Sequence, residues 1–97
     1  MVWQIKFQGS AKRELAILDR PVQLKIRRYL RERIATDEDP RRFGDPLRRD
    51  LAGLWKYRVG GYRVICDIQD HILVVLVVRI GDRKNVYKKK NQLKKPS

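Results

Sequence analysis

Three basic side chains flank a pair of glycines in a pattern suited to binding a phosphate group. Alternating apolar and polar residues on both sides of Gly60-Gly61 predict two β-strands joined by a two-residue hairpin turn. Such a turn fixes the pairing, so Arg58 lies directly opposite Arg63, and Lys56 lies two residues along on the same face. Arginine offers planar, paired N–H donors that match phosphate oxygens. The hairpin therefore predicts a site that could hold a phosphate and stabilise charge on it.

Placing these cations together is unfavourable for the fold itself. Like charges on directly opposed residues destabilise a strand pair by about 0.2–1 kcal/mol, so their presence indicates a use other than stability. The alternative interpretation is that they are ordinary solvated residues, screened by Asp67. The opposite face of the same hairpin is expected to pack beneath helices, and it carries Trp55, Tyr57, Val59, Tyr62, Val64 and Cys66.

A second pair of polar residues follows the next apolar segment. Residues 72–80 are almost wholly apolar, which predicts a central strand covered on both faces, with Gly81 at its end. If the chain then makes a helical turn, Arg83 and Tyr87 fall four residues apart on one side. Taken alone, each is the kind of charge or aromatic ring that is common on a surface. Together they could extend the basic hairpin site.

The segments that must position these residues predict an α+β fold. Residues 2–7 alternate and predict an N-terminal strand, and apolar residues at helical spacing then predict two helices that form a hairpin over the sheet. Ser10 is expected to cap the first helix, and Pro21 suits the first turn of the second. The apolar stripe of the second helix consists of Val22, Ile26, Leu30 and Ile34.

The remainder of the chain is a loop followed by β-structure. Residues 36–50 mix proline, glycine and charge, and they predict a loop with a short helical turn. Three segments between residues 54 and 80 then predict a three-stranded antiparallel meander. The order β-α-α-β-β-β gives one small twisted sheet, followed by a short basic helix or tail. We therefore expect a single domain over residues 1–97, with 88–97 as the basic tail.

The composition indicates a polyanionic partner. The 97 residues include 24 Lys and Arg against 11 Asp and Glu, a formal net charge of +13, and a compact domain with this charge attracts polyanions. We expect neither a membrane span nor a signal peptide, because the longest apolar run is Ile72–Val78. The single cysteine, Cys66, cannot form an internal disulfide, which fits the cytoplasm. The only histidine, His71, falls in a turn, and no His, Cys and carboxylate residues have the spacing of a metal site.

Two segments resemble the RelE branch of the RelE/ParE toxins of bacterial and archaeal toxin–antitoxin modules. Residues 51–68, LAGLWKYRVGGYRVICDI, are similar to the family pattern of a leucine–glycine turn, an aromatic followed by alternating basic residues, and Gly-Tyr-Arg at the start of the next strand. Residues 79–87, RIGDRKNVY, are similar to its strand end with Gly-x-Arg and a near-terminal Val-Tyr. Asp82 departs from the histidine that many relatives outside this branch carry. The resemblance implies a RelE-like, microbial-RNase-like fold.

The resemblance also implies a ribosome-dependent endonuclease that cuts messenger RNA in the ribosomal A site. The cleavage would need neither metal nor cofactor, and an RNA 2′-hydroxyl would attack the adjacent phosphorus. Carried over to this sequence, the catalytic residues are Lys56, Arg58, Arg63, Arg83 and Tyr87. The arginines would stabilise the phosphorane, and either Lys56 or Tyr87 would act as the base. The other basic residues, on the second helix and near the C-terminus, are expected to contact ribosomal RNA: Lys25, Arg27, Arg28, Arg31, Lys84, Lys88, Lys89 and Lys90.

The partners implied by the resemblance are an acidic RelB-like antitoxin encoded beside this chain, the ribosome with its 16S ribosomal RNA, and messenger RNA, with no membrane. We expect the antitoxin to interfere at the C-terminal segment by covering or displacing Tyr87. Two other functions stay open. One is a non-enzymatic module that binds RNA or the ribosome. The other is a ParE-like inhibitor of DNA gyrase, although such relatives tend to lack the complete set of basic residues and tyrosine present here.

Overall fold

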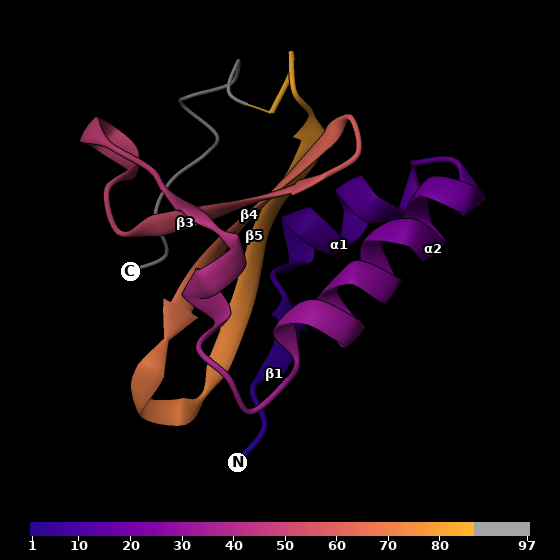
Figure 1. The fold of residues 1–97 in the computed structure, drawn as a ribbon. Coiled ribbons are helices and arrows are strands. Elements are labelled where there is room, and N and C mark those ends of the chain that lie inside the picture. The colour runs from indigo at the N-terminus through magenta and orange to yellow at the C-terminus, as the bar shows by residue number, and fades with distance from the viewer. Residues whose placement is uncertain (87–97) are drawn as a thin grey trace.

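The computed structural model describes residues 1–86, which form an open five-stranded sheet with two helices on one side (Figure 1). The strands lie in the order β1-β5-β4-β3-β2, with β1 parallel to β5 and the other neighbours antiparallel. The predicted α+β fold is confirmed, and the element order is as predicted except for the additional short strand β2. The elements are β1 (Gln4–Phe7), α1 (Gly9–Ala16), α2 (Arg20–Tyr29), β2 (Asp45–Pro46), β3 (Leu54–Val59), β4 (Tyr62–Gln69) and β5 (Val74–Asp82).

The N-terminal strand joins the sheet at its edge, beside the last strand. β1 runs parallel to β5, with Ile5 paired to Val75. Parallel neighbours require a long connection, and here the helices, the loop and the first two meander strands lie between them in the sequence. The predicted alternation is confirmed, because Trp3 is buried while Gln4 and Lys6 are exposed.

The two helices begin differently from each other. The predicted cap at Ser10 is wrong, because α1 begins at Gly9 and its N-cap residue is Gln8, whose side chain makes no capping bond. Gln8 still donates its backbone N–H to the Val77 carbonyl oxygen of β5 at 2.9 Å, so the chain passes directly from the sheet into the helix. In α2, Pro21 occupies the first turn, as predicted.

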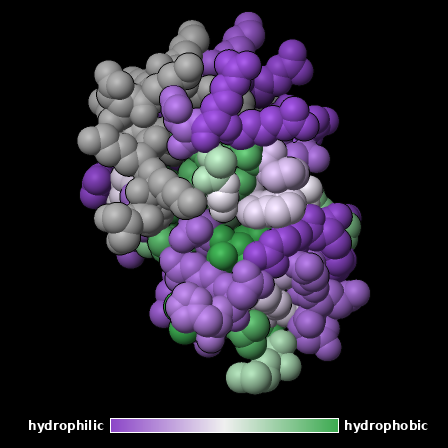
Figure 2. Space-filling view, turned by 90° about the vertical axis from the view of Figure 1, so that its left-hand side faces the viewer, coloured by the Kyte–Doolittle hydropathy of each residue, from purple (hydrophilic) through white to green (hydrophobic). Residues whose placement is uncertain are grey.

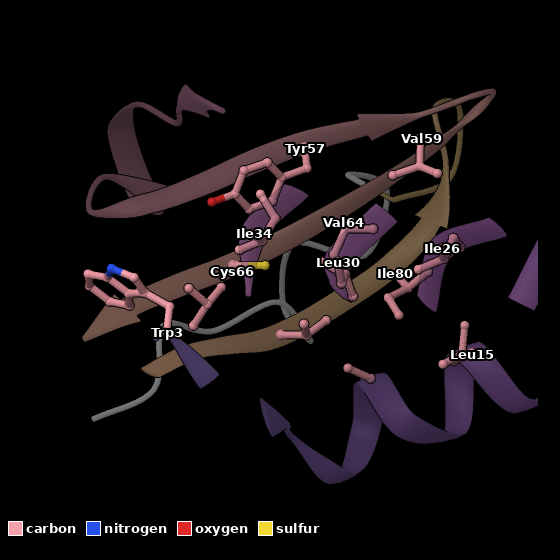
Figure 3. Close-up of a cluster of buried hydrophobic side chains, with 13 residues drawn as sticks. Trp3, Leu15, Ile26, Leu30, Ile34, Tyr57, Val59, Val64, Cys66 and Ile80 are labelled. Atoms are coloured by element: carbon pink, nitrogen blue, oxygen red, sulfur yellow. The ribbon is translucent and has the colours of Figure 1, made fainter. Parts of the chain in front are cut away.

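The helices cover one face of the sheet and enclose the main core (Figure 3). The apolar spacing of α2 continues through a π-helical turn, Leu30–Ile34, which keeps both ends of that turn buried with Ile26. Among residues 1–86, no charged side chain is buried, and no helix is long and apolar enough to cross a membrane. The sheet residues of this core include Tyr57, Val59, Val64, Cys66 and Ile80.

The loop before the meander adds a short strand to the sheet. It contains the predicted helical structure as two 3₁₀ turns, Pro40–Phe43 and Arg49–Leu51, with β2 between them. The buried Tyr57 hydroxyl donates to the Pro40 carbonyl oxygen at 2.7 Å and fixes the loop to β3. β2 pairs only with Trp55 and Lys56, so the part of β3 next to the hairpin turn forms the edge of the described sheet.

The last strand begins later and ends later than the sequence indicates. Ile72 was expected in the strand, but it lies in a 3₁₀ turn and is 55% exposed. Leu73 then adopts a left-handed conformation with φ of 54°, and β5 begins only at Val74. The strand also continues past Gly81 to Asp82. An apolar run alone does not show where a strand begins, because isoleucine and leucine occur both in strands and in the turns that precede them.

Candidate active site

The hairpin between β3 and β4 has the register that its two-residue turn predicts. Gly60 has a φ of 61°, as the first central residue of a type II′ turn requires. Arg58 pairs with Arg63, and the alternate residues of both strands enter the helix-covered core, except for Trp55. The prediction was wrong for this residue, because Trp55 is only half-buried and Arg41 lies 5.7 Å from its ring centroid. Lys56, Arg58 and Arg63 therefore project from the other face of the sheet, which we call the basic face.

Arg63 is held in place by the hairpin turn. Its Nη1 donates to the carbonyl oxygens of Gly60 at 3.1 Å and Tyr62 at 2.9 Å. A guanidinium has five N–H donors, so several remain for a ligand after these bonds are made. The turn thus orients a permanent positive charge before any ligand arrives, which is the kind of preorganisation that stabilises an anionic transition state.

A carboxylate lies at the rim of the basic face. Asp45 of β2 pairs across the strands with the half-buried Lys56, and its Oδ2 lies 4.0 Å from Nε of Arg58, whose side chain is 67% exposed. An exposed ion pair of this kind contributes about 0–1 kcal/mol. Asp67, which would screen the cations in the alternative interpretation, accepts a hydrogen bond from Gln69 Nε2 at 3.1 Å. The sequence did not single out Asp45, because a two-residue strand has no recognisable pattern.

Arg83 is tied to the same hairpin through its backbone. Its backbone N–H donates to the Gly61 carbonyl oxygen at 3.1 Å. Two residues earlier, Gly81 of β5 pairs with Arg63 of β4. The side chains of Arg83 and of the predicted RNA-contacting Lys84 are exposed. The structure therefore brings the Arg83 backbone to the turn that carries the other basic residues.

Asp82 organises the turn after β5. Its carboxylate accepts hydrogen bonds from the backbone N–H of Asn85 at 2.8 Å and from Asn85 Nδ2 at 3.0 Å, and its carbonyl oxygen accepts from the Val86 N–H at 2.9 Å. The short carboxylate thus caps a helical turn in the manner of an N-cap residue. Asp82 therefore has a structural use in this chain.

A second apolar cluster lies on the basic face. Val86 is 1% exposed and packs back over the sheet. A Cβ on Gly81 would lie 3.2 Å from Val86 Cα, so this close approach requires a glycine or a small shift of the turn. The cluster fixes the start of the C-terminal segment beside the cations, and its members are Leu54, Ile65, Val78 and Val86, with Leu47, Leu51 and Leu76 packed against them.

Four of the predicted functional residues lie outside the described residues. These are the predicted catalytic Tyr87 and the predicted RNA-contacting Lys88, Lys89 and Lys90. The chain enters this segment from Val86, which is anchored on the basic face.

The basic residues of α2 divide between two sides of the helix. Lys25 and Arg28 line a groove between α2 and the free part of β3, whereas Arg27 and Arg31 line a separate, largely apolar groove beside β1. Hydrophilic side chains cover most of the side of the molecule drawn in Figure 2, with apolar surface in small patches between them. The sequence predicted these cations as one group, and their separation follows from how the helix is rotated on the sheet.

The other residues whose side chains could take part in chemistry lie outside the basic face or are buried in the core. Burial raises the pKa of the Cys66 thiol, so it stays protonated and is a poor nucleophile. Arg79 Nε lies 3.1 Å from Glu14 Oε2, and the same carboxylate accepts the Ile80 N–H, which joins α1 to β5. His71 is exposed. Over residues 1–86, no three His, Cys, Asp or Glu side chains are placed to hold a metal ion together.

Comparison with known proteins gives consistent matches over most of the chain. The model of the ParE toxin family of type II toxin–antitoxin systems matches residues 5–87. The toxin RelG of Mycobacterium tuberculosis is 29% identical over 89 residues, which are 92% of this chain and 100% of RelG. The toxin RelE of the same organism is 42% identical over 50 residues, 52% of each chain.

Solved structures agree with these sequence matches. The crystal structure of the RelBE2 toxin–antitoxin complex from Mycobacterium tuberculosis matches with a TM-score of 0.78 and 28% identity, covering 88% of this chain and 95% of that chain. A variant of the E. coli toxin RelE with two arginines replaced by alanine, solved in the free state, matches with a TM-score of 0.70 and 27% identity. The match covers 92% of this chain and 94% of that chain.

Proposed function

Because this chain belongs to the RelE/ParE superfamily of toxins from type II toxin–antitoxin systems, we propose that it is an endoribonuclease. Its substrate is messenger RNA in the ribosomal A site, and its cutting inhibits translation in the cytoplasm. The observation that carries this proposal is the basic face, where Lys56, Arg58 and Arg63 share one side of a hairpin whose turn also binds the Arg83 backbone. The fold gains no stability from opposing these charges, whereas a phosphodiester requires them.

The proposed reaction transfers the phosphoryl group within the RNA strand. The 2′-oxygen forms a bond to the adjacent phosphorus, the bond from phosphorus to the 5′-oxygen breaks, and the products are a 2′,3′-cyclic phosphate and a 5′-hydroxyl. One proton leaves the 2′-hydroxyl and one joins the 5′-oxygen, so the step needs no oxidant, reductant or metal. The chain must supply a base, charge stabilisation and an acid.

The arginines suit charge stabilisation because a guanidinium stays protonated through the cycle. Arg63, fixed by its two bonds to the turn, and Arg58 would contact the non-bridging oxygens of the phosphorane. Arg83 would lie toward the leaving 5′-oxygen. Lys56 and Tyr87 are the two candidates for the base, and Tyr87 could also stack on a nucleobase.

The variants that test this site are Arg83→Ala and Tyr87→Phe, assayed for cleavage of A-site codons on programmed ribosomes. We expect each to lose most of the cleavage, while the matched control Arg13→Ala, an exposed arginine on α1, retains it. Cleavage that is unchanged in both site variants would contradict the assignment of the site.

The proposed regulatory partner is an acidic, RelB-like antitoxin. Several structural neighbours are complexes of RelE-type toxins with RelB antitoxins, and the net charge of +13 favours association with an acidic chain. We propose that the antitoxin inhibits by covering the basic face or the segment that follows Val86. Co-expression of an adjacent acidic reading frame should restore growth, whereas an unrelated acidic protein should not.

Gyrase inhibition is the second candidate function, because the matching family model is that of the ParE toxins. A supercoiling assay with purified DNA gyrase distinguishes this function from the proposed endoribonuclease activity. Inhibition of supercoiling by this chain, together with intact messenger RNA on programmed ribosomes, would favour gyrase. Ribosome binding without either activity would favour a non-enzymatic binding module.

A further inference from the structure

A basic groove lies between α2 and the uncovered end of β3. Its volume is about 300 Å³. Four of its lining residues are cations, and its one acidic residue, Glu32, has a carboxylate oxygen 3.9 Å from Arg31. The lining residues on which the following argument depends are Lys25, Arg28, Tyr29, Arg33, Arg58 and Gly60.

The groove adjoins the candidate active site, because the two share Arg58 and the hairpin turn. Arg58 belongs to both, because it stands on the basic face and also lines the groove. Gly60 lines the groove as well, and its carbonyl oxygen accepts a hydrogen bond from Arg63. The pairing of β2 with β3 extends only as far as Lys56, so no described strand lies beside β3 between Lys56 and the hairpin turn. A polyanion held by the basic face can therefore continue around the edge of the sheet onto α2.

The hairpin turn allows Lys25 to reach over it. A Cβ on Gly60 would lie 2.9 Å from Lys25 Nζ, which means that the glycine leaves the space that the ammonium group occupies. The positive φ of Gly60 is what favours a glycine at this position, and the missing Cβ also leaves room for the flexible end of Lys25. The result is a positive charge placed at the junction between the groove and the hairpin.

Tyr29 supplies a neutral donor in the floor of the groove. Its ring is half-buried against the core, 6.1 Å from that of Tyr57. Burial raises the pKa of the Tyr29 phenol, and the Arg33 charge opposes that shift in part. The hydroxyl therefore stays protonated near neutral pH and can donate a hydrogen bond.

The groove on the other side of α2 has a different character. It is lined by the apolar Ile5, Phe7 and Leu30, and the guanidinium of Arg27 lies 5.5 Å from the Phe7 ring centroid. A cation over an aromatic face is already partly satisfied by the protein. In the basic groove Arg33 is engaged in the same way, 5.4 Å from the Phe43 ring centroid, so Lys25 and Arg28 are the cations better placed for binding phosphates.

We propose that the basic groove binds the phosphodiester backbone of RNA beyond the candidate cleavage site, with Lys25, Arg28 and Arg33 as its contacts. This inference rests on the proposed ribonuclease function for the identity of the RNA. The phosphates come either from the messenger strand that leaves the active site or from ribosomal RNA around it. Arg33 is an addition to the RNA-contacting residues predicted from the sequence.

The test compares two double variants with the same net charge. Lys25→Gln/Arg28→Gln removes two groove cations, and Lys12→Gln/Arg13→Gln removes two exposed cations from α1, outside both grooves. Both are made in an Arg83→Ala chain so that cleavage does not interfere, and circular dichroism confirms folding. Binding to short and long single-stranded RNA oligonucleotides and to purified ribosomes is measured across salt concentration.

We expect the groove variant to bind RNA about tenfold more weakly than the α1 variant at low salt. Its plot of log affinity against log salt should be shallower by about 1.4, because two phosphate contacts on a single strand are lost. A loss that grows from short to long oligonucleotides identifies the messenger strand, and a loss confined to ribosomes identifies ribosomal RNA. The single variant Arg33→Gln should show about half the change in slope.

Equal affinities and equal salt slopes for the two double variants, on oligonucleotides and on ribosomes, would overturn the proposal. The proposed function fails differently. If the chain with Arg83 intact leaves messenger RNA uncut while the groove variant still loses RNA binding, the groove stands and the ribonuclease assignment does not.

Discussion

The helix-covered face of the sheet and its basic face use the same two strands in opposite ways. On the first, Tyr57, Val59 and Val64 pack against α2 in a core without buried charge among residues 1–86. On the second, the intervening residues Lys56, Arg58 and Arg63 place like charges together above a small apolar cluster. The period of two along each strand separates the two sets completely.

This difference indicates which residues serve stability and which serve chemistry. Side chains under α2 contribute burial, and each one removed leaves a cavity. The cations of the basic face oppose one another, so removal of the exposed Arg58, which makes no hydrogen bond to the turn, should not lower the free energy of unfolding. Variants of the two faces should therefore change different measurements, and the predictions below test that separation.

The largest effect is expected from the double variant Arg58→Ala/Arg83→Ala. Loss of one preorganised donor to a transition state typically costs about 10²–10³ in rate, and two should cost more. The free energy of unfolding should change by less than about 0.5 kcal/mol, because both side chains are exposed. Cleavage on programmed ribosomes tests the predicted loss of rate, and urea unfolding of the same preparation tests the predicted stability. A large loss of stability would show that the faces are not independent.

The opposite result is expected for Ile26→Ala, which truncates a fully buried α2 residue. Such a change should lower the free energy of unfolding by about 2–5 kcal/mol. Ile72→Ala is the matched control, since this isoleucine is 55% exposed and should change stability by less than about 0.5 kcal/mol. Urea unfolding curves measure both. Equal stability of the two variants would contradict the position of the core.

Val86→Ala should affect both measurements moderately. It removes two buried methyl groups from the small cluster on the basic face, which costs about 1.5 kcal/mol. It also loosens the turn that holds Arg83, so cleavage should fall several-fold. Val2→Ala, at a valine that is 59% exposed, is the control for both assays. If cleavage by Val86→Ala is unaffected, this turn does not position the site.

The smallest effect is expected at alkaline pH. Burial raises the pKa of the Cys66 thiol above its ordinary value of 9.0, so the folded chain keeps a proton that the unfolded chain releases. The stability contributed by this group is present below the ordinary pKa and is lost as the pH rises above it, by about 1.4 kcal/mol per unit. Cys66→Val should lose less stability than the parent between about pH 8 and about pH 10. Identical pH profiles would contradict the burial of the thiol.

The hairpin site could be predicted closely because its geometry is local. A two-residue turn fixes every pair along β3 and β4, so the sequence placed Arg58 opposite Arg63 without knowledge of the rest of the chain. The four-residue spacing of α2 predicted its buried stripe for the same reason. Hairpins and helices can be predicted in this way because residues close together in the sequence determine their geometry.

The features that the sequence did not predict depend on residues far apart in the chain. Asp45 reaches the basic face because the loop adds β2 to the sheet, and Val86 covers Gly81 because the turn after β5 folds back. Likewise, only the rotation of α2 on the sheet separates Lys25 from Arg27. Periodicity says which residues share a face, but it does not say what that face meets.

The most direct test of the central claim is the chemical nature of the RNA ends produced on programmed ribosomes. The basic face is proposed to bring a 2′-hydroxyl, a phosphorus and permanent positive charge together. The account therefore predicts a cut in the A-site codon with a 2′,3′-cyclic phosphate, or its hydrolysis product, on one fragment and a 5′-hydroxyl on the other. Arg63→Ala should lose this cut and Arg13→Ala should retain it. Uncut messenger RNA, or fragments with a 5′-phosphate, would contradict the claim.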